Sequence, residues 1–353
     1  MSRETATWLN TNVLVGFTDK RGHAWHYRAS DQGGESNHYP GPVPVPDVQR
    51  RLFAWTAESR PVGVRLPAEL DTATGVDDDG TPYRWETLDD RQAMVRSDTG
   101  AVLGLFKDGY RAHQYGEWLL GTVATILDDD LSIGSAGLLK GGAVAWVSVE
   151  VPDTITTPEG VMFRPNLLAC TSFDGSLATT FKRVVTNVVC DNTMAAGLAE
   201  RGQQFKARHS RWSGMRIGEA REALAVVHTI ADDFAAEVKQ LCATSVSDAQ
   251  WRAFVEAHVP LPKPGADKTN RGRTIAEEKR GKLHKLYRYD ARVSPWAGTA
   301  FGVLQAVNTY VHHEQTVRGA GRPERNMLRA VEGGVDDLDQ GTAATLAKVL
   351  AKV

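Results

Sequence analysis

The chain has 353 residues, of which 42% are hydrophobic and 24% are charged, and its formal net charge is −2. These values are ordinary for a globular protein with a buried core, and the length favours roughly two domains. The charge excludes a chain coated in basic residues, but it is compatible with a local basic groove balanced by acid elsewhere. The three cysteines are widely spaced and form no CxxC pair, which argues against a zinc knuckle or a disulfide framework.

The sequence also argues against a secreted or membrane-bound protein. Its first residues, MSRETATWLNTNVLVGF, lack the basic segment and long apolar core of a signal peptide. No apolar run reaches the ~20 residues that a membrane-spanning helix needs. We therefore expect a protein of a reducing cytoplasm with no membrane partner.

Residues 1–110 predict a β-rich N-terminal region with one short helix. NVLVGFTD (12–19) alternates like a strand, PDVQRRLFAWTAE (46–58) is typical of a helix, and RQAMVRSDTGAVLGLF (91–106) is typical of a β-hairpin. Residues 71–98 carry eight carboxylates against three arginines, a net charge of −5. We interpret this acidic stretch as a solvated loop, because a carboxylate metal site would need partners that the sequence does not show.

Residues 111–216 predict an α+β core with an antiparallel sheet. A helix at 115–127 precedes a hairpin that turns at Gly141-Gly142, and two strands follow at 161–173 and 177–190. A last helix is predicted to begin near Asn192. The order is thus helix, three or more strands, and helix.

Residues 217–353 predict a mostly helical C-terminal region with a flexible linker near 260–273. An apolar stripe at alternating spacings of three and four predicts a helix that packs on another helix, from this chain or a second copy. Its members are Ile217, Ala220, Leu224, Val227, Ala231, Phe234, Val238 and Leu241. Capping boxes at Ser247 and Thr274 predict two helix starts, and Ser294-Pro295 predicts a third.

The junction TNVVCDNTMAAGL (186–198) places three polar residues between a strand-like run and a helix-like run. Asp191, Asn192 or Thr193 could cap the N-terminus of the predicted helix. The same N-terminus, with nearby hydroxyls and amides, is also a natural seat for a phosphate group. Both interpretations stay open at the level of sequence.

Cationic residues gather in two stretches that contain aromatic residues. Residues 263–292 hold ten Lys and Arg against four Asp and Glu, a net charge of +6, with Tyr287 and Tyr289 among them. A first stretch runs from Lys182 to Arg216 and includes Trp212. This pattern suits a single strand, where cations follow phosphates and rings stack on bases, although a solvated basic helix face has the same appearance.

Enzymatic patterns are weak. His23 and His26 have no carboxylate partner in a metal-binding motif, and His312-His313 ends an apolar helix. The sequence contains no GxGxxG after a strand, no GxxxxGK[ST] and no GxSxG, so nucleotide hydrolysis and acyl transfer lack support. We expect no catalytic residues, no cofactor and no metal.

Five separated motifs nevertheless occur in an order that resembles a family of phage/plasmid-like proteins that share a domain of unknown function. The similarity covers about residues 85–315, and Phe173 and Asn187 stand where that family usually has histidine and arginine. The motifs are Asp98-Thr99-Gly100-Ala101-Val102-Leu103-Gly104 with Tyr110, Ala136-Gly137-Leu138, Phe173-Asp174-Gly175-Ser176, Val188-Val189-Cys190-Asp191-Asn192-Thr193, and Trp296 with Asn308, Tyr310 and His312. The resemblance implies a mobile-element protein of a bacterial host cytoplasm, and it brings no established activity.

The element order is also similar to the core of single-strand annealing recombinases such as RecT, Red-beta and Erf, which is an analogy of fold. Our leading hypothesis is therefore an oligomeric protein of DNA recombination that binds single-stranded DNA. The alternatives are a metal-dependent nuclease of a mobile element and a protein-binding module that counters host defence. The predicted DNA-binding residues are Lys182, Arg183, Asn192, Thr193, Lys206, Arg208, Arg211, Lys279, Arg280, Lys282, Lys285 and Arg288.

Overall fold

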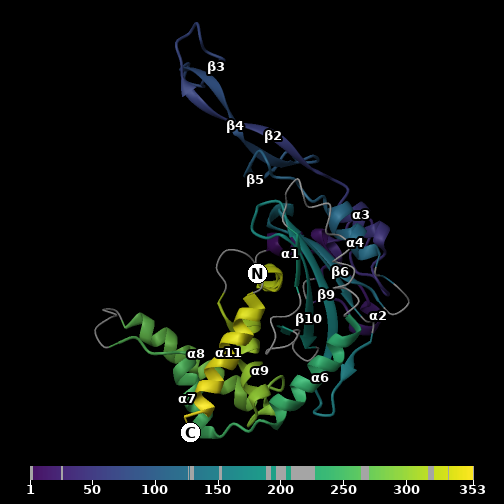
Figure 1. The fold of residues 1–353 in the computed structure, drawn as a ribbon, viewed down its shortest axis with the longest axis vertical. Helices are drawn as coiled ribbons and strands as arrows, with labels where there is room; N and C mark the ends of the chain where they lie inside the picture. The colour runs from purple at the N-terminus through teal and green to yellow at the C-terminus, as the bar shows by residue number, and fades with distance from the viewer. Residues whose placement is uncertain are drawn as a thin grey trace.

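The computed structural model describes most of the chain. The described residues are 3–24, 27–125, 127, 131–150, 153–187, 192–195, 204–207, 227–263, 270–316, 322–332 and 334–352. They form an α+β protein with two antiparallel sheets and a mostly helical C-terminal region, as the sequence predicted (Figure 1).

The larger sheet is the centre of the molecule, and all its strand pairs are antiparallel. Strand β8 pairs with β9, and β12 pairs with β10 beside β11. Because β1 comes from the N-terminal region and pairs with β6, the first predicted domain contributes a strand to the second. The main path runs in the order β1 (Val13–Val15), β6 (Ser132–Leu139), β7 (Val144–Glu150), β9 (Met162–Ser172), β10 (Thr179–Asn187) and β11 (Asn192–Ala195), with β8 (Ile155–Thr156) and β12 (Gln204–Ala207) beside it.

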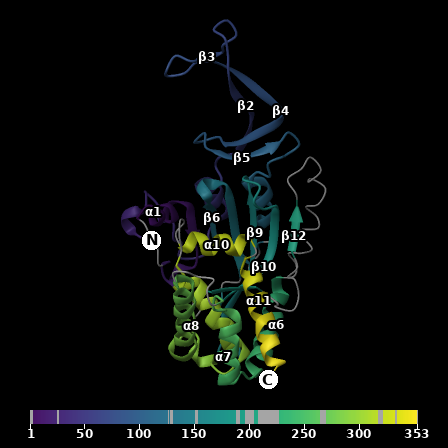
Figure 2. The ribbon, with the colours of Figure 1, turned by 90° about the vertical axis from the view of Figure 1, so that its left-hand side faces the viewer.

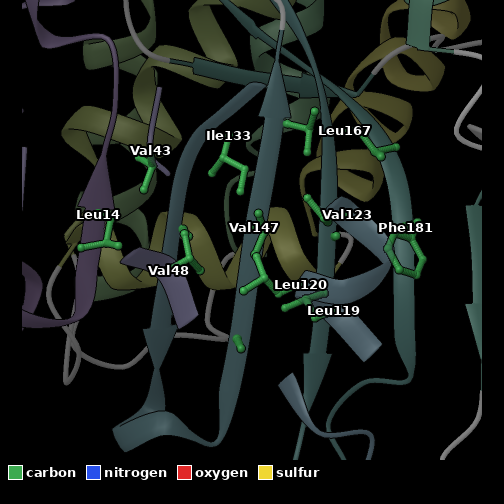
Figure 3. Close-up of a cluster of buried hydrophobic side chains, with 14 of the residues drawn as sticks. Leu14, Val43, Val48, Leu119, Leu120, Val123, Ile133, Val147, Leu167 and Phe181 are labelled. Carbon is green, nitrogen blue, oxygen red and sulfur yellow. The ribbon is translucent and has the colours of Figure 1, made fainter. Parts of the chain in front are cut away.

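Both faces of this sheet are buried, which explains why β7 has no exposed residue. Alternate side chains of a strand point to opposite faces. Val147 packs in the core beneath the helical segments α3, η2, α4 and α6, whereas its neighbour Trp146 packs with α1 and α10 on the other face. Figure 3 shows the first of these two cores, with side chains from β1, β6, β7, β9 and β10 meeting those of the covering helices. The helices are α1 (Arg3–Asn12), α3 (Val45–Leu52), η2 (Tyr115–Leu120), α4 (Gly121–Ala124), α6 (Val227–Ala243) and α10 (Arg322–Glu332), and the short α2 (Thr18–Arg21), η1 (Ala29–Asp31) and η3 (Lys140–Gly142) lie in connections.

The smaller sheet forms an arm that projects from one end of the body (Figures 1 and 2). Its strands are β2 (Ala57–Pro67), β3 (Gly75–Val76), β4 (Pro82–Arg96) and β5 (Val102–Lys107), in the order β2-β4-β3 with β5 also on β4. The β4–β5 hairpin confirms the prediction for residues 91–106, and Gly100 takes the positive φ of 72° that its turn requires.

The C-terminal helices pack around α9, all of whose residues are buried. Their core joins Trp251 of α7, Leu283 of α8, Val303 of α9 and Leu346 of α11. The elements are α7 (Asp248–His258), α8 (Arg271–Tyr289), η5 (Ser294–Trp296), α9 (Ala300–Thr309), η6 (Tyr310–Glu314) and α11 (Gly334–Leu350).

The long apolar stripe packs against other elements of the same chain, as far as the structure describes it. Its first residues lie outside the described part, and α6 begins at Val227. Phe234 and Val238 belong to the core on the main sheet, and the Phe234 ring lies 4.6 Å from that of Phe163 in β9. The stripe therefore packs on a sheet face as well as on α9.

Several predicted boundaries were wrong. Asn192–Ala195 forms strand β11, paired with the end of β10, where the sequence predicted the start of a helix. The predicted helix at 46–58 ends at Leu52, and its last two residues open β2. The β6–β7 turn is longer than the predicted Gly141-Gly142 turn, because Leu139 pairs with Val144.

Helix starts in the C-terminal region also differ from the sequence patterns. Thr274 lies inside α8, which begins at Arg271, so its capping-box pattern is not a cap and the predicted linker is shorter. Ser294-Pro295 opens a short 3-10 turn, and Thr299 caps α9 instead. The Ser247 capping box is confirmed, with Gln250 N donating to Ser247 Oγ at 3.2 Å and Ser247 N donating to Gln250 Oε1 at 2.8 Å.

The two capping-box patterns can be compared by mutation. We expect Ser247→Ala to lower the free energy of unfolding by about 1 kcal/mol, because it leaves an N–H group of the first turn of α7 without its acceptor. Thr274→Ala is the matched control, since Thr274 only donates back to Asn270 O within the helix, and it should change the stability by less than about 0.5 kcal/mol. Urea unfolding measures both; equal losses would contradict the assignment of the caps.

Candidate functional site

The end of β4 meets the β6–β7 and β9–β10 turns where the arm joins the main sheet. Arg96, at the end of β4, donates from Nη1 to Gly141 O at 2.9 Å, in the β6–β7 turn. Its guanidinium lies 4.1 Å from the ring centroid of Trp55. Phe173, which opens the β9–β10 turn, donates from its backbone N to Ala143 O at 2.7 Å. We call the residues of these turns, with the aromatic side chains that cover them, the turn cluster.

Aromatic packing fills the turn cluster. Tyr115 stacks on Phe173 with ring centroids 4.1 Å apart, and its hydroxyl donates to Gly142 O at 2.9 Å. Trp55 meets both rings edge-on. Phe173 is only 1% exposed, so this side chain serves as a packing residue.

Ion pairs connect the elements around the turn cluster. Lys140 Nζ lies 3.3 Å from Asp174 Oδ2 and 3.2 Å from Glu332 Oε1, which connects the β6–β7 turn to the β9–β10 turn and to α10. Burial alone would raise the pKa of Asp174, but hydrogen bonds from Ser176 and the charge of Lys140 outweigh it and lower this pKa. Burial likewise opposes the charge of Lys140, yet Asp174 and Glu332 raise its pKa. These ion pairs link the β6–β7 turn, the β9–β10 turn and α10, and the three side chains together carry a net charge of −1.

The described residues contain no cluster of potential metal ligands. No group of three or more His, Cys, Asp or Glu side chains comes together there. His38 uses both ring nitrogens internally, with Nδ1 2.7 Å from Asn37 Oδ1 and Nε2 accepting from Ala24 N at 3.0 Å. His23 stacks against the same ring, and its predicted companion His26 lies outside the described residues.

The DNA-binding residues predicted on and after β10 are not brought together on a described surface. Lys182 is only 4% exposed in the sheet, which leaves little of it for a phosphate. Of Arg183, Asn192, Thr193 and Lys206 the structure describes the backbone, in β10, β11 and β12. Because Asn192 and Thr193 lie in a strand, neither interpretation left open by the sequence, a helix cap or a phosphate seat at a helix N-terminus, holds at these two residues. Arg208 and Arg211 lie outside the described residues.

Helix α8 carries the remaining five predicted residues, and three of them turn toward the protein. Lys279 lies 5.4 Å from the ring centroid of Tyr310, and burial lowers its pKa. Arg280 donates from Nε to Val259 O at 2.8 Å, at the end of α7. Arg288 forms an ion pair with Asp248 at the start of α7. These three cations fasten α8 to its neighbours.

The other two, Lys282 and Lys285, point outward. Both are exposed, and neither has an ion-pair partner within the part of the chain that the structure describes. They belong to one exposed stripe of α8, spaced 4-3-4-3-4, which we call the α8 stripe. Its members are Arg271, Ile275, Glu278, Lys282, Lys285 and Tyr289.

Arg271 and Tyr289 lie in the second basic stretch that the sequence reasoning singled out, but they were not among the DNA-binding residues that it predicted. Tyr289 is 81% exposed, an unusual position for a large aromatic side chain. The helical period of the stripe could have found both, because residues three and four apart share one face of a helix. With seven Lys and Arg against two Glu, α8 has a net charge of +5.

Comparison with known proteins identifies the family. Residues 102–332 match the family model of the domain of unknown function DUF932, and the chain belongs to this family. No curated protein and no solved structure shows significant similarity to the chain. Among the described residues, no helix combines the length and the apolar character that crossing a membrane requires.

The fit of the turn cluster can be tested at Gly104. A Cβ there would lie 2.7 Å from Phe173 O and equally close to the Phe106 ring, so Gly104→Ala should destabilise the fold by about 1–3 kcal/mol. Gly341→Ala is the control, because that glycine faces open space in α11 and alanine favours helix by up to about 1 kcal/mol. Thermal unfolding compares the two; an unchanged melting temperature for Gly104→Ala would contradict the packing.

Buried histidines predict a loss of stability in acid. Burial lowers the pKa of His312, and of His113 and His258, to about 4 from the ordinary 6.5. Between these values the unfolded chain binds more protons than the folded one, so stability falls as the pH drops from 6.5 to 4. For His312 the slope approaches about 1.4 kcal/mol per pH unit. Urea unfolding across this range should show a shallower slope for His312→Gln; an unchanged slope would contradict the assignment.

Proposed function

We propose that this chain binds single-stranded DNA, without sequence preference, through the α8 stripe. The observation that carries the proposal is the exposure of Lys282, Lys285 and Tyr289 on one face of α8, whereas Lys279 and Arg280 of the same helix contact the protein. A positive surface that follows the phosphates and a ring that stacks on a base are the two components of such sites.

The dimensions of the stripe suit a short run of nucleotides. Arg271 and Tyr289 are separated by roughly 27 Å at the helical rise of 1.5 Å per residue. Lys282 and Lys285 lie one turn apart on the same stripe as the exposed Tyr289. One base would stack on Tyr289, while the neighbouring bases can face away from the helix with their phosphates on the lysines, which leaves these bases free to pair with a complementary strand.

The wider hypothesis follows from this binding mode. A protein that binds the backbone and leaves bases available can promote annealing, and the motif order resembles proteins of phages and plasmids. We therefore place the proposed activity in DNA recombination for a mobile element, in a bacterial cytoplasm and without a nucleotide cofactor. The nuclease alternative has less support, since the described residues contain no cluster of metal ligands.

The lysines provide the first test. Lys282→Glu/Lys285→Glu should weaken binding to a labelled single strand by at least about tenfold and flatten the slope of log affinity against log salt by about 1.4, because two phosphate contacts are lost. Lys348→Glu/Lys352→Glu is the control, since it makes the same charge change at the exposed end of α11. Fluorescence anisotropy across salt measures both; equal weakening by the two pairs would reduce the effect to net charge and contradict the site.

The ring provides a second test with a different signature. Tyr289→Ala should cost about 1–3 kcal/mol of binding free energy while the salt slope stays unchanged, because stacking releases no counterions. Tyr289→Phe retains the stacking surface and should bind like the parent protein. If Tyr289→Ala binds as tightly as Tyr289→Phe, the ring does not contact bases.

A further inference from the structure

The outer part of the arm, residues 63–87, holds an ordered aromatic surface. The Trp85 ring lies over Gly63, where a Cβ would come within 2.3 Å of its Nε1, and Tyr83 lies over Gly75 in the same way. Arg65 pairs across the strands with Trp85, and its guanidinium sits 4.7 Å from the centroid of the Tyr83 ring. An ion pair from Arg65 to Asp77, at 2.5 Å, completes the arrangement. The two glycines leave room for the rings, and the contacts with Arg65 hold the rings in place in the free protein.

This surface is exposed. Trp85 is 55% exposed on the face that carries Arg65 and Tyr83, and Val64 and Val76 are exposed on the opposite face of the same outer arm. Exposed apolar side chains gathered on one element mark an interaction surface. Trp, Tyr and Arg are also the residue types that contribute most to binding at protein interfaces, and here they are already ordered.

The outer arm is acidic. It contains two arginines against six carboxylates, a net charge of −4. Asp77 and Glu86 pair with the arginines, whereas Glu69, Asp71, Asp78 and Asp79 have no ion-pair partner among the described residues. Such a surface repels nucleic acid and selects a basic partner.

We propose that the outer arm docks on the α8 stripe of a second copy of this chain. The stripe offers the matching features: the unpaired Lys282 and Lys285 for the carboxylates, and the exposed Ile275 and Tyr289 for the apolar side chains. A symmetric contact of arm with arm would instead oppose two surfaces of charge −4, which disfavours it. Charge complementarity therefore favours α8 of a second copy as the partner of the outer arm.

The positions of the two surfaces decide the type of assembly. The arm projects from one end of the long axis, and α7 and α8 lie toward the other, so an arm does not reach α8 of its own chain (Figures 1 and 2). A contact between different surfaces of two copies is head-to-tail, and it generates rings or open filaments. The inference does not depend on DNA binding, although a single strand and the arm would compete for Lys282 and Lys285.

The test measures self-association of the full chain by sedimentation velocity, without DNA, at low and high salt. The parent protein should associate at low salt and dissociate at high salt. Trp85→Ala should weaken association by at least about tenfold, while Leu105→Ala, an exposed apolar residue on β5 outside the outer arm, should leave it unchanged. A monomeric parent protein at low salt, or equal effects of the two variants, would overturn the proposal.

Charge reversal identifies the partner surface. Asp78→Lys/Asp79→Lys and Lys282→Glu/Lys285→Glu should each be monomeric alone, and their mixture should associate again because opposite charges then face each other. Continued association of the α8 variant alone would point to arm–arm pairing and overturn the proposal. DNA binding is measured separately at monomeric concentrations with Trp85→Ala, which keeps the α8 stripe. Loss of association with retained DNA binding supports this inference by itself, and absence of DNA binding with retained association contradicts only the proposed function.

Discussion

The burial of the main sheet on both faces is the constraint on which the rest of the structure depends. In β7, the side chain of Val147 is covered by the helices α3, η2, α4 and α6 on one face of the sheet, and the side chain of Trp146 is covered by α1 and α10 on the other. Segments from both ends of the chain are therefore drawn onto one sheet, since buried apolar area is the main source of stability. The β6–β7 turn at Lys140 and the β9–β10 turn at Phe173 lie side by side at one end of this sheet, where the arm begins.

This arrangement separates two kinds of surface. The turn cluster uses aromatic packing and the hydrogen bond from Arg96 to Gly141 O to hold the arm to the body, while the ion pairs of Lys140 with Asp174 and Glu332 tie the two turns to α10. Structure rather than chemistry thus accounts for the motifs that meet there. Two groups of exposed charged residues lie away from this joint: carboxylates on the outer arm, and Lys282 and Lys285 on α8. The proposed binding at α8 rests on this distribution of charge.

Much of the fold follows from local patterns in the sequence. Strands β1, β6, β7, β9 and β10, the β4–β5 hairpin and the Ser247 cap were predictable, because period-two alternation, turn glycines and capping boxes act over a few residues. The helix predicted at Asn192 failed because pairing with β10 overrides the local preference of a short segment. The outer arm, residues 63–87, could not be predicted. An exposed acidic stretch has the same sequence pattern as a loop when its long-range strand pairing, such as that of Arg65 with Trp85, is unknown.

The candidate site was predictable in part. Charge density located α8, but it could not show that Lys279, Arg280 and Arg288 would be used to hold the helix in place while Lys282 and Lys285 stay exposed. Helical periodicity carries part of that information, because the apolar residues Ala276, Leu283 and Leu286 mark the packed side of α8, and Lys282 and Lys285 lie off that side. It also connects the two lysines to Tyr289, which charge alone does not.

Lysine footprinting of the unmodified protein tests the central claim most directly. The rate at which a small acylating reagent labels each lysine is measured by mass spectrometry, with and without a saturating single strand. If the α8 stripe binds DNA, the strand should slow labelling of Lys282 and Lys285 and leave Lys348 and Lys352 unchanged. Uniform protection of all four lysines, or protection of none, would contradict the proposal that this face is the binding site.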